Sequence, residues 1–383
     1  MKSLINFFSL IVIIGFPRFP ESDIPLCVVL LPFYWRVLID GFLLESIKRS
    51  LFCSMAVFVY GVCVWLIHDA SDFLDFKFLF VLFAKCVLTI CSAIVVVELI
   101  CRNKKILLIW ICVQSILIFL SIGSAPVFDF LVLFSGAAGY DVYSQIGGLR
   151  GIGFGVVHVY GAYTIVSACA LYIMYEHVNF FKKIFLIASL LLSFFVARTA
   201  LIVAAVLLIF KSTFRFLVVI FLYYCASYAF YLYGNTDSIL YQILEPGVNY
   251  FGSGEIYTAS TNANLEMIKF PTDLFGWLAG YGKFFDEGLF FENTDLGYSR
   301  LTLYGGIGFL NLYLIANIYP VVKGWLLVNK INNSSKDDYK ILLFVYAISF
   351  LVVNAKGIID IGLFSYVAML LAQKSLVSVR QYE

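Results

Sequence analysis

Four cationic residues stand at the ends of long apolar runs, where charge is rare in this sequence. Arg150 closes a glycine-rich stretch, Arg198 separates two short apolar runs, and Arg300 follows an acidic and aromatic segment. Lys356 lies in an Asn-Ala-Lys-Gly turn between the last two apolar runs. Because guanidinium and ammonium groups bind phosphate oxygens, these residues together are typical of a phosphate or pyrophosphate site. Each of them taken alone is explained equally well as an interfacial anchor or as the partner of a nearby carboxylate.

One carboxylate, Asp295, lies five residues before Arg300. It could act as a general base on a sugar hydroxyl or orient that hydroxyl, and it could also simply cap the following helix. Tyr281, Tyr298 and Trp277 precede Arg300 in the same segment and could stack on sugar rings. Anchoring at a membrane interface is the alternative explanation for these three aromatic residues.

Motifs for metals, nucleotides and disulfides are missing from the sequence. There is no Cys/His cluster with metal-ligand spacing, no Walker motif and no dinucleotide-binding motif. The nine cysteines lie in or beside apolar runs and predict no disulfide framework. We therefore expect neither a metal nor a cofactor, and the net charge of +2 gives no reason to expect a nucleic-acid partner.

The elements that must position these residues are apolar. Hydrophobic residues make up 62% of the chain and charged residues only 13%, about half the share of an ordinary globular domain. A lipid bilayer is the solvent that fits this composition, and we predict one all-α, polytopic membrane domain over residues 1–383. It would have about twelve spans, at 3–17, 24–40, 50–67, 77–100, 106–124, 154–176, 184–197, 199–211, 214–234, 300–323, 341–353 and 358–373.

Lysine and arginine are concentrated in alternate loops, and this bias predicts that both termini are cytoplasmic. Two outer loops then stand out: the glycine-rich 125–153 and the long, acidic and aromatic 235–299. The aromatic content of the longer loop argues against disorder, so we expect it to contain short helices. With this topology the four cations and Asp295 all lie at the outer face.

Four segments combine these features in a fixed order along the chain. They are 147–153 (GGLRGIG), 197–200 (ARTA), 274–308 (from LFG to GGIG) and 354–357 (NAKG). In these segments the chain resembles bacterial O-antigen polymerases of the Wzy type and, more distantly, O-antigen ligases. The resemblance implies a GT-C-like membrane fold in the inner membrane of a Gram-negative cell, with both outer loops in the periplasm.

The resemblance also implies an activity. A polymerase of this family joins oligosaccharide repeat units carried on undecaprenyl pyrophosphate, so its partners would be a lipid-linked donor, a lipid-linked acceptor, membrane lipids and a chain-length regulator. Arg150, Arg198 and Arg300, assisted by Lys356, would bind and neutralise the leaving pyrophosphate. Asp295 would activate or orient the acceptor hydroxyl.

Some residues depart from the family pattern. Ala197 stands where serine is commoner, and Asn311 occupies the glycine position of a second Arg-x10-Gly motif after Arg300. An O-antigen ligase is the first alternative, but residues 235–299 contain no histidine, which favours a polymerase. A flippase or transporter for the same lipid-linked sugars is the second alternative. It would be expected to show internal repeats and charges deep in its spans, and we see no repeat.

Overall fold

The computed structural model describes residues 2–20, 22–68, 72–136, 139–140, 143, 150–175, 179–197, 213–235, 239–256, 258–330, 336–358 and 362–380. Within these ranges the chain is mostly helical, and its only sheet is a two-stranded antiparallel pair. Four helices of the described ranges are long and apolar enough to cross a membrane: α4 (Glu45–Ile67), α5 (Phe73–Arg102), α6 (Lys105–Gly123) and α16 (Gly297–Val328). A mostly helical chain with apolar, membrane-length helices is thus confirmed, and the twelve spans and the GT-C-like arrangement stay predictions.

The chain divides into two compact units. Unit 1 comprises Met1–Phe33, Val96–Ala259 and Asp337–Val345. In its core, the side chain of Gln114 in α6 accepts a hydrogen bond from the Phe154 backbone N–H at 3.0 Å, which ties the segment after Arg150 to that helix. Besides α6, the described helices that lie wholly in unit 1 are α1 (Lys2–Gly15), α2 (Cys27–Leu30), α7 (Ala125–Val132), α9 (His158–Tyr175), α10 (Phe180–Val196), α12 (Thr213–Tyr233) and α13 (Ile239–Ser253).

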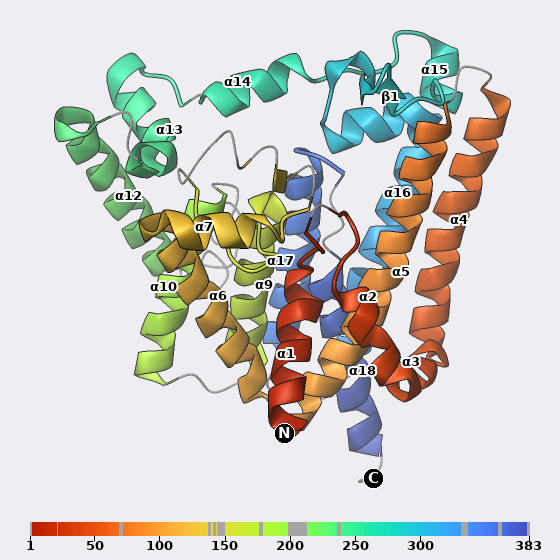
Figure 1. Ribbon diagram of the computed structural model, residues 1–383, viewed down its shortest axis with the longest axis horizontal. Coiled ribbons are helices and arrows are strands. Elements are labelled where there is room, and N and C mark those ends of the chain that lie inside the picture. Colours follow the sequence, from red (N-terminus) through yellow and green to blue (C-terminus); the bar gives the residue numbers. More distant parts are fainter. Residues whose placement is uncertain are drawn as a thin grey trace. The chain divides into compact units, whose positions relative to one another are not determined.

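Unit 2 comprises Tyr34–Val95, Ser260–Lys336 and Tyr346–Glu383. Its long helix α16 packs against α4 and against α18 (Leu363–Arg380), and α15 (Leu274–Ala279) packs on α16 near the end where that helix begins (Figure 1). The remaining elements are α3 (Trp35–Phe42), α14 (Ala259–Glu266), the strands β1 (Phe285–Asp286) and β2 (Leu289–Phe290), the short helix η3 (Phe291–Asn293) and the last turns of α17 (Lys336–Asn354). The predicted long loop 235–299 does contain short helices, namely α13, α14 and α15.

The predicted span at 24–40 is helical from Cys27 onward, but its helix is not regular. It divides into α2, the short 3-10 helix η1 (Leu31–Tyr34) and α3. Pro32 lies inside η1 and has no backbone N–H to donate, so a regular α-helical hydrogen-bond ladder cannot run through this point. The helix here is therefore irregular, and the span over 24–40 stays a prediction.

Helix α16 is interrupted one turn after Arg300. Gly305 has φ −131° and ψ 21°, and Gly306 has φ 68° and ψ −170°, a conformation open essentially only to glycine. A Cβ atom on Gly306 would lie 2.5 Å from the carbonyl oxygen of Leu278 in α15. Gly306 thus both breaks the helix and lets α15 approach its backbone.

The break in α16 also anchors the segment that follows α15. The backbone N–H of Tyr281 donates to the carbonyl of Leu303 at 2.6 Å, and that of Gly282 donates to the carbonyl of Tyr304 at 2.9 Å. These carbonyls would be paired within a continuous helix. In this structure the two carbonyls instead hold residues 281 and 282, which lead into β1, against α16.

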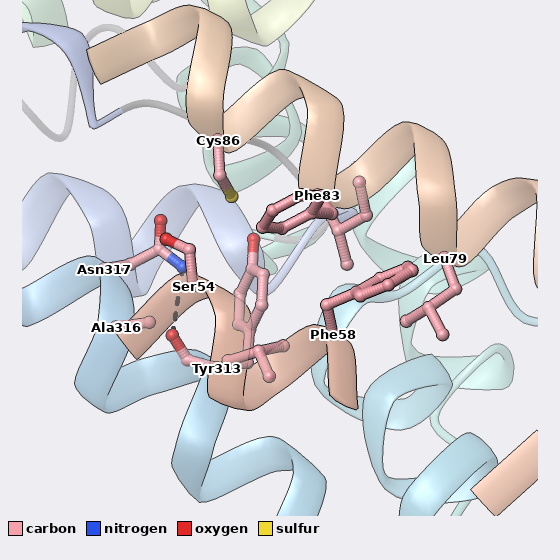
Figure 2. Close-up of a pocket in the computed structure, with 10 residues that line it drawn as sticks. Ser54, Phe58, Leu79, Phe83, Cys86, Tyr313, Ala316 and Asn317 are labelled. Atoms are coloured by element: carbon pink, nitrogen blue, oxygen red, sulfur yellow. Dashed lines mark hydrogen bonds between the residues drawn. The ribbon is translucent and has the colours of Figure 1, made fainter. Parts of the chain in front are cut away.

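Two polar side chains deeper on α16, those of Asn317 and Tyr313, make hydrogen bonds close by. Figure 2 shows a pocket between these helices, where Asn317 and Tyr313 lie beside Ser54 and Cys86. The side-chain amide of Asn317 donates to the backbone carbonyl of Tyr313 at 2.9 Å, and the Tyr313 hydroxyl donates to Asn354 Oδ1 at 3.3 Å. Such pairing is what a membrane interior requires of buried polar groups.

Candidate functional site

Arg300 is the buried cation at the centre of the candidate site. It lies in the first turn of α16, where its backbone N–H donates to Leu296 at 2.9 Å, and only 6% of the residue is exposed. Its Nε and Nη2 atoms are buried and have no hydrogen-bond partner. A buried guanidinium with unmade hydrogen bonds is costly, and a ligand that reached these donors with acceptor oxygens would satisfy them.

Phenylalanine rings surround this guanidinium. Among the described residues, four rings lie within cation-π distance of Arg300 Cζ: Phe78 of α5 at 4.7 Å, Phe284 at 5.7 Å, Phe285 of β1 at 5.3 Å and Phe290 of β2 at 4.3 Å. We call these four residues the aromatic cage. Ring faces attract the cation but supply no acceptor for its N–H groups, so the cage holds Arg300 while leaving its hydrogen bonds unmade.

Asp295 is the carboxylate nearest to Arg300 in sequence, and it too is incompletely paired. Its Oδ1 atom is buried without a hydrogen-bond partner. The side chain does not cap the helix, because the N-cap residue of α16 is Leu296 and no side chain makes a capping hydrogen bond there. The Leu296 backbone N–H donates to Thr294 Oγ1 at 3.3 Å. The capping role is therefore excluded, and an acceptor oxygen remains available beside the start of α16.

Lys356 belongs to the same unit as Arg300 and Asp295. It lies in the turn after α17, and that turn packs tightly against the start of α16. A Cβ atom on Gly297 would lie 2.4 Å from the carbonyl oxygen of Asn354 and 2.6 Å from that of Gly357. Because Gly297 has no side chain, the backbone of residues 354–357 packs against α16 at a point three residues before Arg300.

The three predicted sugar-binding aromatics lie in unit 2 with different surroundings. Trp277 is 39% exposed and stacks on Phe270 with ring centroids 5.6 Å apart. The half-buried Tyr298 donates its hydroxyl to the carbonyl of Leu351 in α17. Trp277 lies in α15, Tyr281 follows that helix, and Tyr298 lies in the first turn of α16.

The hydroxyl of Tyr281 has a fixed partner in Asp273. It donates to Asp273 Oδ2 at 2.8 Å, while Oδ1 of the same carboxylate accepts the N–H of Gly276 at 2.7 Å and caps α15. The Gly276 N–H and the Tyr281 hydroxyl together lower the pKa of Asp273 below its usual value. Tyr281 therefore keeps a defined orientation at the surface of the segment.

Two predicted residues are not in unit 2. Arg150 is half-buried in unit 1, where the next backbone N–H, of Gly151, donates to the carbonyl of Phe195 at 3.0 Å. Arg198 lies outside the described residues. Of the predicted set, the structure places Asp295 and Arg300 at the start of α16, and it packs the backbone of the turn that carries Lys356 against Gly297 of the same helix. Within the described ranges, no three His, Cys, Asp or Glu side chains gather in a way that could hold a metal ion.

The aromatic cage and a buried acid, Asp75, were not found by sequence reasoning. Asp75 opens α5, is completely buried and accepts hydrogen bonds from the backbone N–H groups of Phe284 at 2.7 Å and Phe285 at 3.0 Å. Its sequence context, an acidic loop directly before an apolar run, was the one available signal.

The site thus combines a cation with unmade hydrogen bonds, a carboxylate with a free acceptor oxygen and a lysine-bearing turn. Such a set can bind an anion and accept a proton from a hydroxyl group close to it. A scan against protein-family models finds no match to this chain, and neither does a comparison with curated protein sequences.

Proposed function

We propose that this chain is an O-antigen polymerase of the Wzy type. It would be a glycosyltransferase that joins oligosaccharide repeat units carried on undecaprenyl pyrophosphate, at the periplasmic face of the bacterial inner membrane. The observation that carries the proposal is the buried Arg300 guanidinium, whose Nε and Nη2 atoms have no partner. A pyrophosphate group is the kind of ligand that would satisfy these donors, because guanidinium groups bind phosphate oxygens in pairs.

The reaction needs a stabilised leaving group. A hydroxyl oxygen of the acceptor sugar attacks the anomeric carbon of the donor, and the bond from that carbon to the pyrophosphate oxygen breaks. The electron pair leaves with undecaprenyl pyrophosphate, and Arg300 neutralises the negative charge that develops there. The hydroxyl proton passes to the carboxylate of Asp295, whose Oδ1 atom is free to accept it.

The other predicted residues keep their roles as proposals. Lys356 would assist Arg300 in binding pyrophosphate, and Tyr281, Tyr298 and Trp277 would contact the sugars. For Arg150 and Arg198 the pyrophosphate-binding role rests on the resemblance alone. The GT-C-like fold, the cytoplasmic termini and the lipid and chain-length-regulator partners belong to the same proposal.

Deleting the gene in its native host tests this function. The polymerase role predicts lipopolysaccharide that carries a single repeat unit, because ligation continues while extension stops. The measurement is the banding pattern of lipopolysaccharide on a gel, with the plasmid-borne wild-type gene as the control that restores long chains. Loss of every O-antigen band would point to a ligase or a flippase, and unchanged long chains would refute any role in O-antigen assembly.

A further inference from the structure

Asp75 is a fully buried carboxylate that the proposed reaction does not use. Its Oδ1 atom accepts the backbone N–H groups of Phe284 and Phe285, and its Oδ2 atom accepts that of Asp72 at 3.0 Å. The first two bonds join residues 209 and 210 positions apart in the chain. One side chain at the start of α5 therefore fixes the backbone of β1.

That backbone carries the rings that cover Arg300. Phe284 and Phe285 belong to the aromatic cage directly, and β1 pairs with β2, which supplies Phe290. Phe78, the fourth ring, lies one turn after Asp75 on α5 and packs on Phe284 with centroids 4.6 Å apart. All four rings of the cage are thus linked to Asp75. Three are linked through its hydrogen bonds to the hairpin backbone, and Phe78 is linked through α5.

We propose that Asp75 is a positioning residue that holds the aromatic cage closed over Arg300. The hydrogen bonds to the N–H groups of residues 284 and 285 set the rings of the β1–β2 hairpin on the guanidinium, and the closed cage keeps water away from its unpaired donors. That a water-shielded Arg300 neutralises the leaving pyrophosphate rests on the proposed function.

A carboxylate suits this task better than an apolar residue. The N–H groups of Phe284 and Phe285 lie in a buried setting, and without an acceptor each would lose its hydrogen bond and keep its desolvation cost.

Chemical modification of Arg300 tests the proposal without any substrate. The full-length protein in detergent micelles is treated with phenylglyoxal, and modification at each arginine is followed by mass spectrometry. In the wild type Arg300 should react slowly, because the cage covers it. In Asp75→Ala it should react at least about tenfold faster, since two buried N–H groups lose their acceptor and the hairpin opens. The rates at the other arginines should not change.

Two further variants sharpen the test. Asp286→Ala is the matched control, because it removes an exposed carboxylate of the same hairpin. The partner of that carboxylate is Lys283 at 3.0 Å, and in this variant Arg300 should stay protected from phenylglyoxal.

Asp75→Asn keeps one acceptor oxygen for the N–H groups of residues 284 and 285, so its modification rate at Arg300 should lie between those of the wild type and Asp75→Ala. If Asp75→Ala does not fold, the Asp75→Asn rate decides. An unchanged Arg300 rate in the folded Asp75 variants would overturn the proposal, as would rapid modification in the wild type.

The same variants separate this proposal from the proposed function. In the native host, Asp75→Ala should shorten the O-antigen chains at normal protein levels, and Asp286→Ala should not. If Arg300 becomes reactive in Asp75→Ala while long chains persist, the positioning role stands and the role of Arg300 in polymerisation fails.

Discussion

Replacing Arg300 by alanine is expected to abolish chain extension while the protein still accumulates in the membrane. The guanidinium is the buried cation of the site with unmade hydrogen bonds, so its loss removes the group that would neutralise the leaving pyrophosphate. Removing one preorganised donor of this kind typically lowers a rate roughly 100- to 1,000-fold. The measurement is the O-antigen ladder in a deletion strain that carries the variant, normalised to the amount of membrane protein.

Arg300→Lys distinguishes the geometry of the site from its charge. Lysine keeps the positive charge, but it lacks the planar fork that binds two phosphate oxygens and lies flat against phenylalanine rings. We expect it to restore extension only weakly. The matched control is Arg49→Ala, because Arg49 is an exposed arginine paired with Glu45 at 2.9 Å, and this variant should make normal chains. Normal chain length in Arg300→Ala would contradict the assignment of Arg300.

Gly306→Ala is expected to prevent the protein from folding normally. The residue has φ 68° and ψ −170°, and an added Cβ would lie 2.5–2.7 Å from backbone atoms of Trp277 and Leu278. Backbone strain and a clash with rigid atoms add together here, and we expect a cost of more than about 3 kcal/mol. Thermal unfolding of the detergent-solubilised protein and its level in membranes measure this effect.

Gly123→Ala is the control for the glycine prediction. Gly123 ends α6, and a Cβ atom there would meet no other atom within 4 Å, so this variant should melt like the wild type. If Gly306→Ala also melted at the wild-type temperature, the break in α16 and the docking of α15 against it would be wrong.

The central residues of the site could be predicted because they are local in sequence. Arg300 and Asp295 stand out as charges next to a long apolar run, and the energetic cost of charge at membrane depth makes such positions informative. The glycines at 305 and 306 also stand out in the sequence, because small residues next to an apolar run allow helices to approach closely. Their second role, interrupting α16, depends on φ and ψ values that no residue pattern specifies.

The aromatic cage and Asp75 could not be predicted, because their partners are far apart in the chain. Asp75 and Phe284 are separated by 209 positions, and nothing in either local segment indicates the other. The irregular helix at 24–40 was not predicted for a different reason, because the hydropathy of an apolar run says nothing of the effect of Pro32 on its hydrogen bonds. Arg198 and the span 199–211 lie outside the described residues and stay predictions.

The most direct test of the central claim is polymerisation by the purified protein. Wild-type protein in lipid nanodiscs is supplied with the host's repeat unit on undecaprenyl pyrophosphate, and glycan length and released undecaprenyl pyrophosphate are measured together. We predict a ladder of glycans, with one undecaprenyl pyrophosphate released for each linkage formed, and neither product from Arg300→Ala. Substrate left unextended by the folded wild-type protein, or extension that proceeds equally well with Arg300→Ala, would contradict the account.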